Sequence, residues 1–165
     1  MLGGRCSVAA LIVTADLPPD LQAWANGLRQ AHYPPERNVL DAHLTLFHAL
    51  PPSCEAELRH ALPAATRDHP PPAARLAGTM SLGRGTALKI DSPTMMALRA
   101  ELADRFAGLL SPQDAYPPRL HVTVQNKVSV EQAKALQAAL ASTLQPRDFR
   151  FAGLALHRYL GGPWE

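Results

Sequence analysis

One four-residue pattern occurs twice in this chain, at His43–Leu46 and at His121–Val124. In each copy a histidine and a threonine alternate with two apolar residues. Because side chains along a β-strand point to opposite faces in turn, the histidine and the threonine share one face and the apolar pair faces a core. An imidazole exchanges protons near neutral pH and a hydroxyl donates a hydrogen bond, so two such strands side by side could surround a phosphate. With 7 histidines in the chain, chance predicts fewer than about 0.1 matches to this pattern.

Length and composition fit an ordinary soluble globular protein. The 165 residues are enough for one compact domain or for two small lobes that share a core, and 18% charged residues with 47% hydrophobic residues argue against disorder. The formal net charge of +2 is too small to indicate a surface dedicated to electrostatic binding of long nucleic acid. A small anionic substrate is therefore favoured.

The cysteines and the N-terminal segment bear on location. Cys6 and Cys54 are the only cysteines, too few for a disulfide framework or a zinc cluster, so we expect a cytoplasmic protein. The apolar stretch Val8–Val13 is too short to span a membrane and has no small-residue cleavage site after it. We expect this stretch to form the first strand, and we expect no membrane partner.

Prolines divide the first half into segments whose patterns predict strand, helix, strand and helix. The predicted elements are a strand at Ser7–Thr14, a helix from Pro18 to about Gln30, the first motif strand at Ala42–Phe47 and a helix from Ser53 to about Leu62. Trp24 falls on the apolar stripe of the first helix, so we expect it in the core. Pro63 is expected to end the second helix, and the prolines of His69–Pro72 predict a stiff linker between the halves.

The second half repeats this order. The predicted elements are strands at Arg75–Leu82 and Thr86–Ile90, a helix from Ser92 to about Leu110, the second motif strand at Leu120–Gln125, a helix beginning at Ser129 and a last strand at Phe149–His157. Ser92 before Pro93 predicts a capped helix start, and Gln132 completes a capping box with Ser129. We therefore expect a duplicated α+β fold with pseudo-twofold symmetry, in a single domain over residues 1–165 with lobes at about 1–68 and 73–165.

The paired motifs resemble those of the two-histidine (2H) phosphoesterase superfamily, in its bacterial 2′-5′ RNA ligase-like, or RNA cyclic phosphodiesterase, branch. The segment Asp16–Leu21 is similar to the opening of those proteins, and His121–Lys127 is similar to their second motif. Ala42 and Leu120 stand where many members have a proline before the histidine. The resemblance implies a bilobal fold in which two antiparallel sheets form a central cleft with helices outside, with exchange of strands between the lobes left open.

The implied activity is hydrolysis of a 2′,3′-cyclic phosphate at an RNA end or on a nucleotide, with 2′-5′ ligation as its reversal and no cofactor. Such a reaction needs a water deprotonated on one side of phosphorus and a leaving oxygen protonated on the other. His43 and His121 are the acid and base candidates, and Thr45 and Thr123 could bind the phosphate oxygens. The resemblance favours His43 as the acid and His121 as the base. These roles exchange when the reaction runs backwards, so the assignment stays open.

Strand parity adds three candidate substrate-binding residues. Phe47 shares the predicted face of His43 and could stack on a base, while Gln125 and Lys127 share the face of His121 and could meet phosphate or ribose. A core phenylalanine and a solvated lysine are the ordinary alternatives. Tyr116, Tyr159 or Trp164 could line a nucleotide pocket. The remaining histidines are left out of the site because none has a matching partner; they are His32, His48, His60, His69 and His157.

Two other classes of protein compete with this interpretation. A metal-dependent hydrolase could use His43, His121 and Asp41, but the usual metal-ligand spacings are absent. A non-catalytic nucleotide- or RNA-binding module would not need two matched histidines. The segment Gly83–Gly85 lacks the Lys-Ser/Thr of a phosphate-binding loop, which argues against nucleoside triphosphate hydrolysis. We expect an RNA end or a cyclic nucleotide as the partner, and no obligate protein partner.

Overall fold

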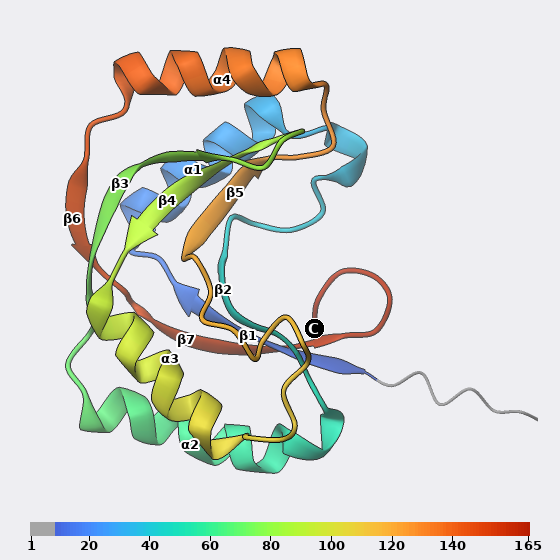
Figure 1. The fold of residues 1–165 in the computed structure, drawn as a ribbon, viewed down its shortest axis with the longest axis vertical. Coiled ribbons are helices and arrows are strands. Elements are labelled where there is room, and N and C mark those ends of the chain that lie inside the picture. The colour runs from blue at the N-terminus through green and yellow to red at the C-terminus, as the bar shows by residue number, and fades with distance from the viewer. Residues whose placement is uncertain (1–8) are drawn as a thin grey trace, which may run out of the picture.

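The computed structural model describes residues 9–165, in which seven strands form two antiparallel sheets. The three-stranded sheet has the order β2-β1-β7, and the four-stranded sheet has the order β5-β4-β3-β6 (Figure 1). The strands are β1 Ala10–Asp16, β2 Leu44–Leu50, β3 Ala73–Ser81, β4 Thr86–Asp91, β5 His121–Gln125, β6 Arg147–Arg150 and β7 Gly153–Tyr159. The prediction of an α+β fold with two antiparallel sheets is confirmed. The part of the first predicted strand at residues 7 and 8 lies outside the described residues.

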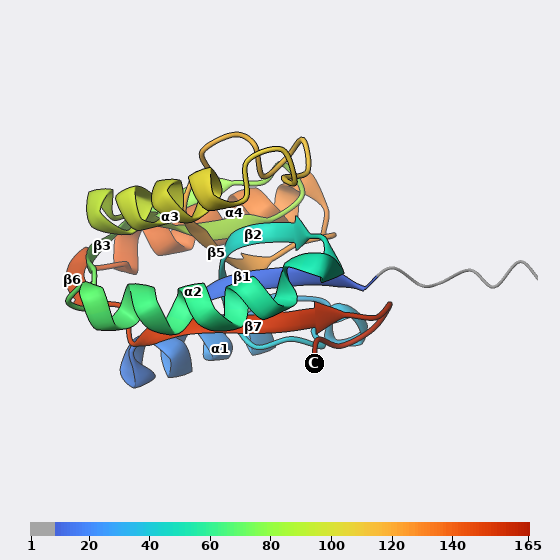
Figure 2. The same cartoon turned by 90° about the horizontal axis from the view of Figure 1, so that it is seen from below.

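Within the described residues, four α-helices pack around the two sheets. They are α1 Pro19–His32, α2 Glu55–Asp68, α3 Pro93–Arg105 and α4 Val130–Thr143. Helices α1 and α4 lie at one end of the molecule and α2 and α3 at the other, with the strands between them (Figures 1 and 2). Helix α2 contacts β7, α4 contacts β3 and β4, and α1 contacts β5. None of the helices within residues 9–165 has the length and apolar character needed to cross a membrane.

The second half of the chain gives one strand, β7, to the sheet of the first half. Strand β3 pairs with β4 within the second half, whereas β7 returns from the end of that half to pair with β1. The predicted single strand at Phe149–His157 is therefore wrong. The segment is interrupted at Phe151 and Ala152, whose backbone N–H groups donate to Pro72 O and Asp16 O. As a result, β6 and β7 join different sheets.

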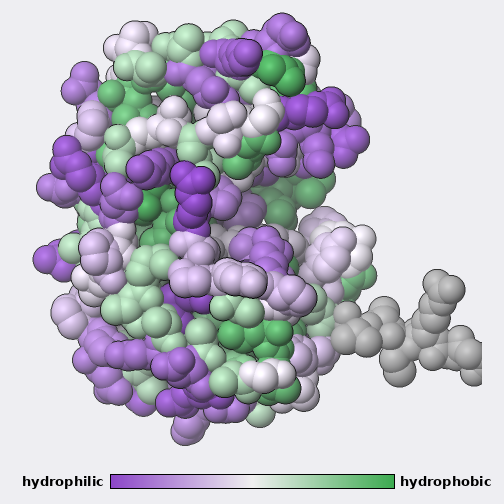
Figure 3. Space-filling view, viewed as in Figure 1, coloured by the Kyte–Doolittle hydropathy of each residue, from purple (hydrophilic) through white to green (hydrophobic). Residues whose placement is uncertain are grey.

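The apolar positions of both motifs lie in one continuous core. Leu44, Leu46, Val122 and Val124 have no exposed surface. A strand with one fully buried face has its register fixed, because a slip of one residue would move these side chains into water. The other face of each motif strand is thereby directed away from the core. On the outside of the molecule, hydrophilic and hydrophobic residues are interspersed over the face drawn in Figure 3.

Three local predictions about the helices are wrong. Helix α2 continues through Pro63 to Asp68, because its buried stripe, which includes Leu58 and Leu62, keeps it packed despite the hydrogen bond that proline removes. Helix α3 ends at Arg105 rather than near Leu110. Trp24 is 39% exposed instead of lying in the core. The Ser92 cap and the Ser129–Gln132 capping box are both present as predicted.

Candidate active site

The two motif strands meet at the centre of the molecule. Strand β2 is an edge strand of the first sheet, β5 is an edge strand of the second, and the two strands contact each other. His43 comes directly before β2 and His121 is the first residue of β5. Both histidines and both motif threonines, Thr45 and Thr123, are partly exposed, whereas the alternate residues are buried. The fold therefore brings the two predicted His-x-Thr faces to neighbouring strand edges.

The two histidine rings are oriented by the same local contact. His43 Nδ1 lies 2.8 Å from Asp41 O, and His121 Nδ1 lies 2.6 Å from Arg119 O, in each case two residues earlier in the chain. Because a carbonyl oxygen only accepts hydrogen bonds, each Nδ1 carries a proton and donates it. In the neutral ring this leaves Nε2 unprotonated and able to accept a proton from a ligand.

Burial lowers the pKa of His43, and the backbone hydrogen bond to Asp41 opposes this effect. The positive charges of Arg29, His157 and His121 lower the pKa of His43 further. His121 is thus near enough for its protonation to disfavour protonation of His43. Such a pair favours states in which the two imidazoles do not both carry a charge, as an acid and base couple requires.

The chain after each motif threonine contains a β-bulge, which overturns the predicted placement of Phe47 and Gln125. Thr45 pairs with Thr14 of β1, but Phe47 pairs with Val13, so two residues of β2 oppose one of β1. A bulge of this kind reverses which face the following residue takes. Phe47 is fully buried and packs under the guanidinium of Arg99, at 4.3 Å from ring centroid to Cζ. Its predicted position on the His43 face is wrong.

A β-bulge in β5 turns Gln125 away from the predicted face in the same way. Thr123 pairs with Ala87 of β4, whereas Gln125 pairs with Thr86. The Gln125 side chain is 4% exposed, accepts a hydrogen bond from Thr86 Oγ1 at 2.9 Å and donates to Gln132 O at 3.4 Å. It is held in the interface with α4 and does not share the face of His121. Nothing in the sequence pattern marks either bulge, since both motifs keep strict alternation up to the bulged position.

Two cationic side chains lie beyond the motif residues on the β5 side. Lys127 is exposed, two residues past the end of β5, at a φ of 60°. Lys89 of β4 is the direct cross-strand partner of His121 and is also exposed. Directly opposed residues of neighbouring strands project from the same face, so Lys89 lies beside His121. The sequence analysis did not identify Lys89, because only the strand register pairs it with the motif.

Two buried arginines hold the motif strands from helices of the opposite halves. Arg29 of α1 donates from Nη1 to Thr123 O at 2.9 Å, and Arg99 of α3 donates from Nε to Leu46 O at 3.2 Å. Both arginines are only 4% exposed. A hydrogen bond from a charged donor to a buried carbonyl is among the stronger ones in proteins. Each motif strand is therefore fixed by a cation supplied from the other half of the chain.

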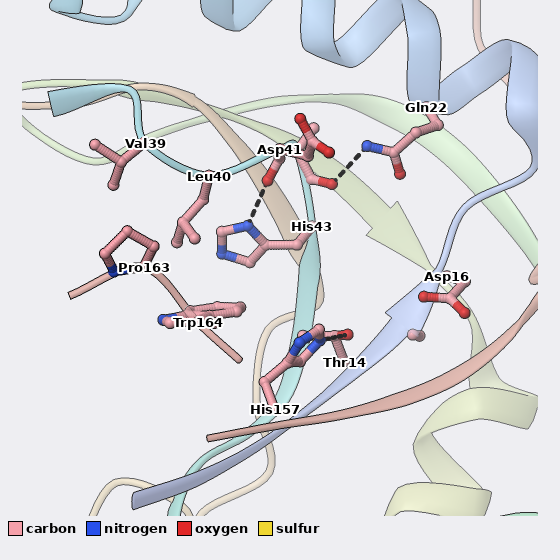
Figure 4. Close-up of a pocket in the computed structure, with 12 residues that line it drawn as sticks. Thr14, Asp16, Gln22, Val39, Leu40, Asp41, His43, His157, Pro163 and Trp164 are labelled. Carbon is pink, nitrogen blue, oxygen red and sulfur yellow. Dashed lines mark hydrogen bonds between the residues drawn. The ribbon is translucent and has the colours of Figure 1, made fainter. Parts of the chain in front are cut away.

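A cavity of about 400 Å³ opens beside His43 (Figure 4). Its walls include Thr14 and Asp16 of β1, His157 of β7 and Trp164. Thr14 Oγ1 and His157 Nε2 lie in hydrogen-bond contact at 2.9 Å. Of these residues, the sequence analysis named only Trp164, as a candidate for lining a pocket. Long-range pairing of β7 with β1 brings His157 to the site, and no local pattern reports that pairing.

The side chains needed for a metal centre are not gathered at this site. Within residues 9–165, no group of three or more His, Cys, Asp or Glu side chains is arranged to share an ion. Asp41, the third ligand in the metal-dependent alternative, is exposed, and its backbone oxygen is occupied by His43. Cys54 is a free, buried thiol.

Two antiparallel sheets whose contacting edge strands each carry a His-x-Thr pattern agree with the arrangement that the resemblance to the two-histidine phosphoesterase superfamily implies. Comparison with protein-family models matches residues 17–163 to the 2′-5′ RNA ligase superfamily. This match covers most of the chain, and the protein belongs to that superfamily.

Solved structures share the fold. They include a phosphoesterase, at 20% identity and a TM-score of 0.55, with 96% of this chain and 93% of that chain covered. They also include E. coli LigT in complex with 3′-AMP, at 22% identity, a TM-score of 0.54 and coverages of 96% and 93%. LigT in complex with NADP+ is similar at 20% identity, a TM-score of 0.58 and coverages of 96% and 92%. At these identities the likeness shows the fold alone. Comparison with curated protein sequences gives no match.

Proposed function

We propose that this protein is a metal-independent phosphodiesterase that opens 2′,3′-cyclic phosphates at RNA ends or on nucleotides, with 2′-5′ ligation as the reverse reaction. One observation carries the proposal: two histidines at the starts of contacting edge strands each donate from Nδ1 to a backbone carbonyl, which leaves Nε2 of the neutral ring unprotonated. This arrangement supports one imidazole taking a proton from water while the other gives a proton to the leaving oxygen. Both transfers use side chains of the chain itself.

The proposed roles follow from the chemistry of in-line displacement. His121 removes the proton from the attacking water, and His43 protonates the leaving ribose oxygen. The lowered pKa of His43 in the free protein is compatible with an acid role, because a bound phosphate anion raises the pKa of a neighbouring imidazole. The hydroxyls of Thr45 and Thr123 donate to the non-bridging oxygens, on which charge grows in the transition state.

A nucleotide is the substrate class we propose. The LigT structures hold 3′-AMP or NADP+, which supports a nucleotide ligand for a protein of the same superfamily. Lys127 stays a candidate phosphate contact, since its exposed side chain is on the β5 side. We expect the reaction to take place in the cytoplasm.

Hydrolysis of nucleoside 2′,3′-cyclic phosphates by the purified protein in excess EDTA, from about pH 5 to pH 9, tests the proposal. We expect turnover that chelator does not reduce, with a bell-shaped pH dependence from two titrating imidazoles. The phosphate isomer of the product identifies which ester bond is cut. Turnover only after a divalent metal is restored would support the metal-dependent alternative. Nucleotide binding without turnover on mononucleotide or RNA substrates would support the binding module.

A further inference from the structure

The cavity beside His43 lies on one side of the proposed catalytic pair. Its lining residues come from β1, α1, the segment 39–43, β7 and the residues that follow β7. None comes from β5, the strand that carries His121. A phosphate held between the two histidines would therefore have free space for an attached group on the His43 side. At about 400 Å³ the cavity falls within the range that small-molecule ligands occupy.

The charges of the cavity select an uncharged group. Its lining includes the carboxylates of Asp16 and Asp41 and no lysine or arginine. Burial lowers the pKa of His157, which the charge of Asp16 opposes, so this imidazole favours its neutral form. A second phosphate would meet carboxylates here without a cation to bind it. A nucleoside has no such penalty.

The walls of the cavity also match the two parts of a nucleoside. Leu40, Pro163 and Trp164 form an apolar wall, and the partly exposed indole offers an aromatic surface. Beside Trp164, Thr14 and His157 share a hydrogen bond of 2.9 Å and keep further polar capacity, because a hydroxyl has one donor and two acceptor positions. Bases stack on aromatic side chains, and sugar and base edges need polar partners.

Contacts within the chain hold Trp164 in place. Its ring meets the ring of His43 edge-on at a centroid distance of 4.6 Å and the ring of His157 at 5.2 Å (Figure 4). The next residue, Glu165, exchanges two backbone hydrogen bonds with Arg158 of β7 at 2.7 and 3.0 Å. The Arg158 guanidinium in turn binds both carboxylate oxygens of Glu55 on α2. This anchoring reduces the ordering cost that a binding loop would otherwise pay.

We propose that this cavity is the nucleoside subsite of the enzyme, with Trp164 as the surface for the base and the Thr14–His157 pair as its polar contact. The inference rests on the proposed function. It adds that the substrate is recognised through its nucleoside on the His43 side, and that His157 is a third histidine of the site.

The test compares a nucleoside 2′,3′-cyclic phosphate with glycerol 1,2-cyclic phosphate, which has the reacting group and no base. The wild-type protein is expected to prefer the nucleoside substrate in kcat/KM by at least about tenfold, the usual scale of one stacking contact. Trp164→Ala and His157→Ala are each expected to lower this preference ratio several-fold, and Trp164→Phe to retain most of it. Trp24→Ala on α1 and His60→Ala on α2 serve as controls, since both side chains are exposed and outside the cavity.

The outcomes separate failure of the subsite from failure of the function. Equal kcat/KM for both substrates in the wild-type protein would overturn the subsite while leaving the proposed function standing. A preference ratio that Trp164→Ala and His157→Ala leave unchanged would do the same. Turnover of neither substrate, nor of an RNA that ends in a 2′,3′-cyclic phosphate, would overturn the proposed function itself. Because the readout is a ratio, a general loss of activity in a poorly folded variant does not imitate the expected result.

Discussion

The two motifs, at strands β2 and β5, share three structural features. In each, the histidine donates from Nδ1 to the carbonyl two residues earlier. A bulge follows the threonine in both strands. An arginine from a helix of the opposite half donates to a backbone oxygen of each strand. The local geometry of the two copies is thus duplicated together with the motif.

The surroundings of the two histidines differ. His43 packs against Trp164 and opens onto a cavity that contains two carboxylates, whereas His121 has Lys89 as its cross-strand partner. Arg29 also acts on the two copies unequally, because it binds the strand of one and lowers the pKa of the histidine in the other. Duplication therefore supplies two histidines that are oriented alike, and the unduplicated segments give them different environments.

Removing either histidine is expected to have the largest effect. His43→Ala and His121→Ala should each lower kcat for a nucleoside 2′,3′-cyclic phosphate by about 10²- to 10⁴-fold, the usual contribution of a general acid or base. Steady-state kinetics measure this loss, and circular dichroism checks that the fold is kept. His60→Ala, on the exposed face of α2, is the matched control. Full activity in either motif variant would contradict the paired scheme.

Substitution of the two threonines should have the next largest effect on activity, and the two effects should be similar. Thr45→Ala and Thr123→Ala should each cost about 2 to 4 kcal/mol of transition-state stabilisation, since each removes one donor to a non-bridging oxygen. Thr→Ser at the same positions keeps the hydroxyl and should keep most of the activity. If only one of the two alanine variants lost activity, the phosphate would be bound by one copy and the functional symmetry of the pair would be refuted.

The sequence predicts what is local and repeated. Alternation in the two motifs predicted the partly exposed His-x-Thr faces and the buried alternate residues, and the caps at Ser92 and Ser129 were predicted from short-range chemistry. These features depend on residues within a few positions of one another. The order of elements predicted the α+β fold, and the resemblance to the two-histidine phosphoesterases supplied the two antiparallel sheets.

The errors arise where distant segments decide the outcome. The face of Phe47 and of Gln125 depends on bulges in the pairing with β1 and β4, which no pattern within β2 or β5 encodes. His157 was left out of the site because it has no motif, yet pairing of β7 with β1 brings it to Thr14. Trp24 follows an apolar stripe but is left partly exposed by the packing around α1.

Substitution of the two arginines should distinguish their effect on the position of the motif strands from the effect of their charge on the pKa of His43. Arg29→Met and Arg99→Met should each lower the free energy of unfolding by about 2 to 3 kcal/mol, because each leaves a buried carbonyl without its charged donor. Denaturant unfolding measures this loss. Only Arg29→Met should raise the pKa of His43, since the charge of Arg29 disfavours the protonated ring.

The pH dependence of stability and activity shows the direction in which Arg29 shifts the pKa of His43. In the wild-type protein the pKa of His43 lies below its unfolded value, so its contribution to stability is complete above about pH 6.5 and falls as the pH drops through the lowered pKa. In Arg29→Met this loss should begin at the same pH but be smaller, and the activity limb set by His43 should move to higher pH. An equal shift in Arg99→Met would show that general loosening, and not charge, is responsible.

The smallest expected effects concern the two lysines on the His121 side. Lys89→Gln should lower kcat/KM by no more than about fivefold, the scale of an exposed charge pair, because Lys89 lies directly across from His121. Lys127→Gln should have a smaller effect, since Lys127 follows the bulge that turns Gln125 away from the site. Kinetics at low and high ionic strength measure both, and added salt should weaken both effects. A larger, salt-sensitive loss in Lys127→Gln would instead mean that the chain beyond β5 turns back to the phosphate, and would make Lys127 the main cation on that side.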